Sequence, residues 1–422
     1  MVFHGESLGL LLVGKEADGM DVEKIRRDFP ILQTNTSGRP IIYMDSASMA
    51  LKPRQVIEAM DDYYFNYPSS AGRSVHKLST RVEEARINAR ETMRRFVGAK
   101  KAEEIVFTRN TTEGLNLVTN SLPLKSGDVV LTTDREHNSN LLPCQMLAER
   151  KGVKHVVVKS HENNIFDMQA FDQALTPEVK LVSFVYTSNL DGYTLPVKEI
   201  IKAAHDNSSL VLLDAAQAAP HHEINVRKIG VDFLAFSGHK LLGPTGTGVL
   251  YVKREHFGKL QPFMVGGETV EWSTYDDHEF SKPPRRFEAG LQNYAGEIGL
   301  AVAAEYLRSI GLNNIENHER ELTKTMHNGL SEIEGASIVG VRDPTLRGGI
   351  TSFTIDGLTY QDIAMILDLN YNIMVRSGQH CVHSWFEANG IEGCARASLY
   401  LYNTLDEVET FGDALKEIAK LR

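Results

Sequence analysis

The chain has 422 residues, 42% hydrophobic and 24% charged, which is the composition of an ordinary globular protein with one large and one smaller domain. Its 45 basic and 55 acidic residues give a formal net charge of −10, which argues against a nucleic acid or an anionic membrane as the main partner. The three cysteines, Cys144, Cys381 and Cys394, form no CxxC pair, so the sequence predicts no disulfide framework and a reducing, cytoplasmic setting.

Residues 1–20 are interpreted as an N-terminal extension of unknown role. Their apolar run at 8–14 is too short to span a bilayer, and it lacks the basic n-region and the cleavage site of a signal peptide. From residue 21 onward, helical periods alternate with short β-rich runs, the pattern of a parallel sheet flanked by helices. The expected strands cover 103–109, 128–134, 153–159, 179–187 and 209–214, and the expected helices cover 111–122, 139–152 and 196–207.

The composition changes near residue 290, and a long amphipathic pattern begins at about residue 295. We therefore predict a large domain over residues 41–290 and a small domain built from residues 21–40 and 291–422. The small domain is expected to contain strands at 348–356, 372–378 and 395–402, followed by a last helix that begins with the capping-box pair Thr404 and Glu407.

A lysine lies in an unusual place, between two strand-like apolar runs within residues 233–251. The polar turn that joins these runs holds Ser237, His239 and Lys240. A buried ammonium is costly unless it is paired or used in chemistry, and Schiff-base formation with a carbonyl is chemistry that desolvation favours. A lysine that serves pyridoxal phosphate in this way also needs a carboxylate for the pyridine nitrogen, a phosphate cradle and a flat group over the ring.

A suitable carboxylate ends the apolar run at 209–214. Asp214 stands at the carboxyl end of a predicted strand, where ligand sites of open α/β sheets occur, and Gln217 follows it. Together, LLDAAQ and FSGHKLLGPTG resemble the cofactor segment of the class V, fold-type-I pyridoxal-phosphate enzymes, among which the Suf-type cysteine desulfurases are most similar to this chain. The resemblance runs from residue 21 to the C-terminus. It implies a mostly parallel central sheet flanked by helices, a smaller α+β C-terminal domain and a homodimer.

The resemblance also implies roles for the residues of these segments. Lys240 would hold pyridoxal phosphate as a Schiff base and move the substrate's α-proton, Asp214 would keep the pyridine nitrogen protonated, and Gln217 would contact the ring hydroxyl.

Thr111 and Thr112 lie between a predicted strand and a predicted helix, where free N–H groups bind anions. Alone, such a pair is usually just an N-cap. Beside the lysine segment it resembles the family's phosphate site, which Ser237 and His239 complete by resemblance.

His137 and Asn189 follow predicted strand ends, where a histidine is more often a surface or capping residue and an asparagine a turn residue. In the resembled family, a histidine in the E-H-x-x-N context lies over the cofactor ring, which implies this catalytic position for His137. The same resemblance implies that Asn189 contacts the substrate carboxylate and a cofactor oxygen.

Cys381 is the candidate nucleophile. Cys144 and Cys394 lie in apolar helix and strand patterns, as buried cysteines commonly do, whereas Cys381 lies on a predicted polar loop among histidines that would favour its thiolate. The segment RSGQHC resembles the family's R-x-G-x-H-C motif, and its Arg376 is expected to help bind the substrate. CARASLYLYNT likewise resembles C-R-A-S-x-x-x-Y-N-T with an inserted-looking alanine, so Arg396 would hold the substrate carboxylate as a bidentate fork.

Three other interpretations fit the sequence less well. Cys381, His383 and Cys394 lack the spacing of a zinc site, so no metal is expected. Ser237 and Lys240 match the S-x-x-K of penicillin-binding hydrolases, but the S-D-N and K-T-G elements do not occur. GPTGTG is not a dinucleotide fingerprint, because no G-x-G-x-x-G precedes a helix.

The chain departs from the family pattern near the site. Leu291 and Gln292 stand where the resembled family has a Thr-Pro pair whose threonine reaches a phosphate across the dimer. An H-R-G-x-H element keeps Arg73 and His76 but has Gly72 and Ser74 at two other places, Gln379 replaces a histidine, and VHSW follows Cys381 in place of Ala-x-Pro.

The resemblance therefore implies conversion of L-cysteine to L-alanine, with a persulfide left on Cys381 and its sulfur passed to an acceptor or scaffold protein for iron–sulfur cluster assembly. A selenocysteine lyase, or another class V aminotransferase-type enzyme, remains an alternative. A non-catalytic scaffold on the same fold is a more remote one, because such a protein would be expected to lack Lys240 or Asp214, and both are present.

Overall fold

The computed structural model describes residues 20–36, 38–72 and 74–421. The N-terminal extension predicted over residues 1–20 therefore lies outside the described residues except for Met20, and so does Arg73. No helix in the described part of the chain is long and apolar enough to cross a membrane.

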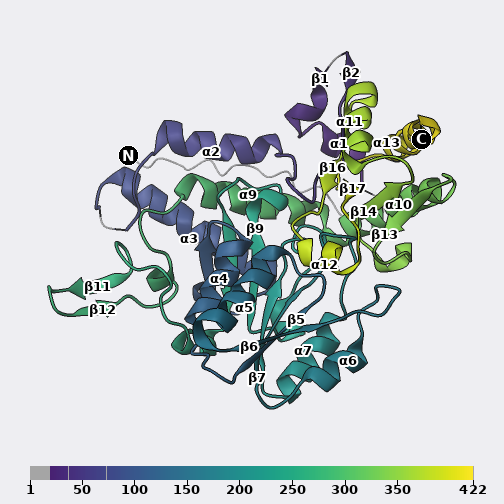
Figure 1. Ribbon diagram of the computed structural model, residues 1–422. Coiled ribbons are helices and arrows are strands. Elements are labelled where there is room, and N and C mark those ends of the chain that lie inside the picture. Colours follow the sequence, from purple (N-terminus) through teal and green to yellow (C-terminus); the bar gives the residue numbers. More distant parts are fainter. Residues whose placement is uncertain (1–19, 37, 73, 422) are drawn as a thin grey trace.

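The large central sheet, which has seven strands among the described residues, is flanked by helices (Figure 1). From β9 to β6 neighbouring strands run parallel, and β10 runs antiparallel to both of its neighbours. The predicted α/β architecture with a mostly parallel sheet is confirmed. The order across the sheet is β4 (Ile105–Thr108), β10 (Gly248–Val252), β9 (Phe233–Ser237), β8 (Leu210–Asp214), β7 (Val179–Val185), β5 (Val129–Thr133) and β6 (Lys154–Val158).

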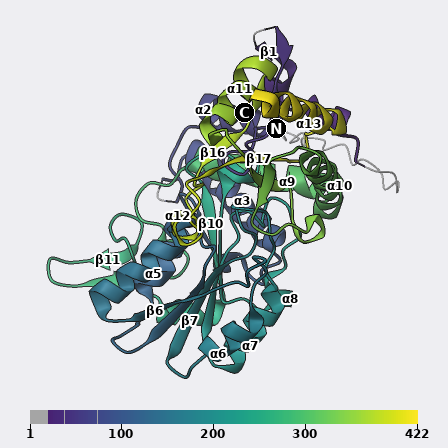
Figure 2. The same ribbon diagram turned by 45° about the vertical axis from the view of Figure 1, so that its right-hand side comes forward.

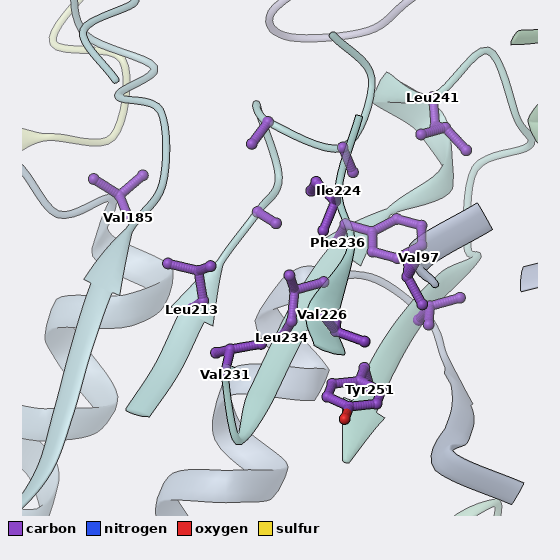
Figure 3. Close-up of a cluster of buried hydrophobic side chains, with 14 of the residues drawn as sticks. Val97, Val185, Leu213, Ile224, Val226, Val231, Leu234, Phe236, Leu241 and Tyr251 are labelled. Atoms are coloured by element: carbon purple, nitrogen blue, oxygen red, sulfur yellow. The ribbon is translucent and has the colours of Figure 1, made fainter. Parts of the chain in front are cut away.

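Successive residues of these strands pack into two different cores, because side chains alternate between the faces of a sheet. In β8, Leu213 belongs to the core that includes α3 (Lys77–Val97), α7 (Val197–Asp206) and α9 (Tyr294–Ile310). Leu212 belongs to the core that includes α4 (Thr111–Ser121) and α5 (Asn138–Lys151). Figure 3 shows part of the first core, where Leu213, Leu234 and Phe236 project from neighbouring strands.

The C-terminal part forms a second, antiparallel sheet with its own core, on the right of Figure 1 and in the upper part of Figure 2. Its order is β13 (Ala336–Val339), β14 (Ile350–Ile355), β17 (Cys394–Ser398) and β16 (Arg376–Gly378). The helices α10 (Leu312–Ser331), α11 (Tyr360–Tyr371) and α13 (Leu405–Ile418) contribute apolar side chains to this core. The capping box of Thr404 and Glu407 begins α13, as predicted.

Shorter elements connect and extend these layers. They are α1 (Val22–Arg26), β1 (Asn35–Thr36), β2 (Arg39–Pro40), β3 (Ile42–Tyr43), α2 (Arg54–Asn66), α6 (Met168–Ala174), α8 (Val226–Ile229), β11 (Val270–Ser273), β12 (His278–Phe280), β15 (Ile373–Met374) and α12 (His383–Ala388). The domain division at residue 290 stays a prediction. The helix that follows it, α9, packs against α2 and α3 and shares the core of the large sheet.

Two expected strands differ from the structure. The single strand predicted over 372–378 is divided: β15 pairs with β3, whereas β16 pairs with β17 in the other sheet. The strand predicted over 395–402 ends at Ser398, because the chain then turns so that the Tyr400 N–H donates to the Asn403 side chain (2.8 Å). The first difference arises from pairing with distant segments and the second from a local turn, and apolar periodicity records neither.

Candidate active site

A cleft of about 400 Å³ lies at the carboxyl ends of β8 and β9, where ligand sites of α/β sheets occur. All of the residues predicted for the site line this cleft: Thr111, Thr112, His137, Asn189, Asp214, Gln217, Ser237, His239, Lys240, Arg376, Cys381 and Arg396. Sequence reasoning missed Asp45, Ser48 and Ser139, which line it as well. Asp45 and Ser48 precede the first predicted strand of the large domain, and no motif marked them.

Lys240 lies at the floor of the cleft, at the end of the short turn that follows β9. Burial lowers the pKa of its amine to about 8, although Asp214 opposes this shift. Asp214 ends the neighbouring strand β8 and is buried, which raises the pKa of its carboxyl group; a hydrogen bond from the Ala216 N–H (2.9 Å) and the charge of Lys240 act against the increase. Asp214 pairs in parallel register with Ala235 of β9, the strand that leads to Lys240. The Asp214 carboxylate and the Lys240 amine therefore lie at the same edge of the sheet.

One corner of the cleft is built at the start of α4. The Thr111 N–H donates to Ser237 Oγ (2.8 Å), and the Thr111 and Ser237 hydroxyls are 2.6 Å apart. Thr112 Oγ1 lies 2.8 Å from Ser139 Oγ at the start of α5. Gly248 permits this approach, because a Cβ there would lie 2.8 Å from the Asn110 backbone. The corner thus gathers hydroxyls and helix-terminal N–H groups, which are donors suited to an anion.

His137 is the N-cap of α5, and its Nδ1 accepts a hydrogen bond from the Ser139 N–H (3.0 Å). Burial, with the charges of Lys240 and Arg396, lowers its pKa to about 3, so the ring is neutral near pH 7. The pKa of His239 is lowered to about 4, chiefly by burial and by Lys240. His137 therefore offers a neutral flat ring to the cleft while it also serves as a cap.

The opposite corner is cationic. Arg396, on β17, donates to the Asn189 carbonyl (2.9 Å) and to Ser48 Oγ (2.9 Å), and it lies 3.6 Å from Asp45 Oδ1. Arg376 approaches the other oxygen of Asp45 at 4.0 Å. The Asn189 side chain donates to the His380 carbonyl (2.7 Å), so the same segment also contacts the cysteine turn.

Cys381 is exposed in the turn between β16 and α12, whereas Cys144 and Cys394 are buried. His380 and Cys381 both adopt left-handed backbone angles, φ 50° and φ 60°. The expectation that His380 assists the thiolate is wrong. Its ring lies 3.2 Å from Cys394 Sγ, and burial together with Arg396 lowers its pKa to about 2, so it carries no charge that would stabilise a thiolate.

Two buried acceptors in the cleft lack partners among the described residues. They are Gln217 Oε1 and Asn189 Oδ1, although the amide nitrogens of both side chains are bonded. Buried polar atoms are normally paired, so these two atoms mark a place where a ligand or water supplies a donor. No group of three or more His, Cys, Asp or Glu side chains in the described part of the chain is arranged to hold a metal ion.

Known proteins are similar to this chain in sequence and in fold. The family model described as Aminotransferase class-V matches residues 42–411. A protein of Halalkalibacterium halodurans named "Probable cysteine desulfurase" is 39% identical over 401 residues, which cover 94% of this chain and 98% of that protein.

Two solved structures are similar over nearly their whole length. The apo structure of a cysteine desulfurase from Thermococcus onnurineus NA1 has a TM-score of 0.92 and 40% identity, and the match covers 97% of this chain and 100% of that one. The cysteine desulfurase CsdA of Escherichia coli, solved with an S-sulfonic acid, has a TM-score of 0.88 and 31% identity, with coverage of 96% and 100%. The match to the family model and the similarity to these relatives agree with the lysine, aspartate and cysteine that line the cleft, and the chain belongs to the class V aminotransferase family.

Proposed function

We propose that this protein is a pyridoxal-phosphate-dependent cysteine desulfurase, which converts L-cysteine to L-alanine and leaves a persulfide on Cys381. The observation that carries the proposal is the joint placement of Lys240, Asp214 and an exposed Cys381 in one cleft. The named relatives, identical at 31–40%, support the same activity.

The residues of the cleft fit pyridoxal phosphate. The Lys240 amine, with its pKa near 8, suits bond formation with an aldehyde. Thr111, Thr112, Ser237 and His239 would hold the phosphate at the start of α4, and Asp214 would face the pyridine nitrogen. The unpaired oxygen of Gln217 suits a ring hydroxyl. When bound, the cofactor supplies an electron sink for the carbanion that forms on the substrate.

Arg396 and Asn189 would bind the substrate carboxylate. The fork of Arg396 is held in place by Ser48 and the Asn189 carbonyl, which reduces the freedom lost when it binds. Arg376 contributes a second positive charge at the mouth of the cleft. The amine of Lys240 at Nζ would accept the α-proton and return a proton to the product, a role that suits a pKa near the working pH.

The proposed sulfur transfer needs no external oxidant. Cys381 Sγ forms a bond to the substrate sulfur while the carbon–sulfur bond breaks, and the electron pair of that bond stays with the substrate carbon, which is then protonated. The products are alanine and a Cys381 persulfide. An exposed thiol at the mouth of the cleft is accessible both to the substrate and to an acceptor protein.

The test is the release of alanine and sulfide from L-cysteine by the cofactor-loaded protein with a reductant, in the wild type and in Cys381→Ser. Stoichiometric products from the wild type alone, with the cofactor still bound in the variant, are expected. Activity that survives in Cys381→Ser would assign the cysteine a structural role. If neither protein forms sulfide, selenocysteine and amino-group acceptors become the substrates to test, and loss of visible absorbance in Lys240→Ala would still establish cofactor binding.

The protein's setting belongs to the same proposal. A homodimer is proposed because fold-type-I enzymes commonly build their sites at a dimer interface, and an acceptor or scaffold for iron–sulfur assembly is proposed to collect the sulfur. A cytoplasmic location is favoured by a chain whose described cysteines are all free thiols.

A further inference from the structure

Asn138 joins the cysteine turn to the start of α5 through two hydrogen bonds. Its backbone N–H donates to the Cys381 carbonyl (2.8 Å), and its side-chain Nδ2 lies 2.8 Å from Nδ1 of His383. His383 is the first residue of α12. Figures 1 and 2 both show α12 beside α5, although the two helices are far apart in the sequence.

The turn that carries the thiol needs external support. Two consecutive residues with side chains, His380 and Cys381, adopt left-handed backbone angles that L-residues disfavour. The carbonyl of each is held from outside the turn: Asn189 binds the first and Asn138 binds the second. Such backbone geometry persists only where surrounding contacts determine it, so these tethers decide where Cys381 Sγ lies.

We propose that Asn138 and His383 form a clamp that positions Cys381 for attack on the substrate sulfur, which makes both of them positioning residues. His383 lies in the segment VHSW, one of the places where the chain departs from its family. Asn138 directly follows His137, so one helix start carries the ring residue and also holds the nucleophile's backbone. The clamp rests on the proposed function for its role in sulfur transfer, but its effect on the turn does not.

The clamp is tested by the rate at which iodoacetamide alkylates Cys381 in the cofactor-loaded protein. Cys144 and Cys394 have no exposed surface, so mass spectrometry reports Cys381 selectively. Asn138→Ala and His383→Ala each remove the side-chain bond between the two residues and so loosen the turn, while the backbone N–H of residue 138 still binds the Cys381 carbonyl. We expect alkylation to accelerate about two- to tenfold, the equivalent of one hydrogen bond. The double variant should be no faster than the single ones, because all three lack the same bond.

His383→Gln, whose amide can still bond to Asn138, should alkylate more slowly than His383→Ala. Ser384→Ala, an exposed neighbour in α12, is the matched control and should equal the wild type. Unchanged alkylation in Asn138→Ala and His383→Ala, or effects that add in the double variant, would overturn the clamp.

Turnover separates positioning from binding. With L-cysteine, the clamp variants should lose about tenfold or more in kcat, because small displacements of a reacting atom are costly, while KM stays near the wild-type value since Arg396 is untouched. A wild type without desulfurase activity, combined with faster alkylation in the variants, would reject the proposed function and keep the clamp. A wild type with desulfurase activity, combined with unchanged alkylation and kcat in the variants, would keep the proposed function and reject the clamp.

Discussion

The protonation of Lys240 is set by its immediate neighbours. Burial lowers the pKa of its amine to about 8, the Asp214 carboxylate raises it, and Arg396 lowers it. Asp214→Asn removes the attraction that favours the ammonium, so the pKa of Lys240 should fall below its wild-type value. The pKa of Lys240 is measured by trace acetylation of the cofactor-free protein with acetic anhydride at a series of pH values, with the modified lysine quantified by mass spectrometry. The midpoint of Lys240 acetylation should move to lower pH in Asp214→Asn. It should not move in the control Asp206→Asn, because Asp206 pairs with the exposed Lys202 instead. A midpoint that is unchanged or higher would contradict this account.

The guanidinium of Arg396 is held in one orientation, which suits it to bind the substrate carboxylate. Its two terminal nitrogens contact Ser48 and the Asn189 carbonyl from a buried position, which fixes the plane of the guanidinium. Lysine keeps the charge but not the planar fork. Arg396→Lys should therefore raise the KM for L-cysteine by about 10- to 100-fold, the equivalent of about 1.4–2.8 kcal/mol of lost carboxylate binding. Steady-state kinetics checks this, and an unchanged KM would show that another group binds the carboxylate.

At the scale of elements, a buried ion network joins α3 to the start of α9. The Glu288 carboxylate receives two hydrogen bonds from Arg90 (2.7 and 2.9 Å) and one from Arg86 (2.5 Å), and Arg86 also binds Glu297 (2.9 Å). The Phe107 N–H of β4 donates to Glu288 as well (2.8 Å). Burial alone would raise the pKa of Glu288, but the two arginines hold it below its usual value. The network thus fixes the helices that cover the edge of the large sheet.

Removal of the Glu288 carboxylate should strongly destabilise the folded protein. Glu288→Ala leaves Arg90 without its buried carboxylate partner and Arg86 with Glu297 alone, and we expect the free energy of unfolding to fall by about 3–5 kcal/mol. Urea denaturation measures the loss. Asp206→Ala breaks an exposed helical pair instead and should change stability little, so a similar small effect in Glu288→Ala would contradict the role assigned to the network.

Elements of the large domain were predictable because their patterns are local. The run at 209–214 alternates between two apolar cores, and it forms β8 as expected. The motifs also predicted a set of residues that line one cleft, although their roles stay predictions. What the sequence did not reveal depends on contacts between distant segments: the division of 372–378 between two sheets, the left-handed turn at Cys381, and the bond from Asn138 to His383.

At the scale of the whole molecule, apolar side chains remain exposed around the junction of α2, α3 and α9. A small buried cluster that includes Tyr63, Val82 and Tyr294 ties these helices together. Near it in the chain, Phe65 is 81% exposed and Leu291 is 76% exposed. Exposed apolar groups mark an interaction surface where they gather into one patch, and a two-fold interface would cover the same residues on both copies.

We therefore expect the proposed homodimer to depend on Phe65 and Leu291. Phe65→Asp combined with Leu291→Asp places charges where apolar contact is expected, and the protein should shift from dimer to monomer at micromolar concentration. Light scattering after size exclusion measures the mass. Leu369→Asp, on α11 in the other layer and 73% exposed, is the matched control and should leave the mass unchanged. A dimer that survives the double substitution would place the interface elsewhere. A wild type that is itself a monomer would contradict the proposed homodimer.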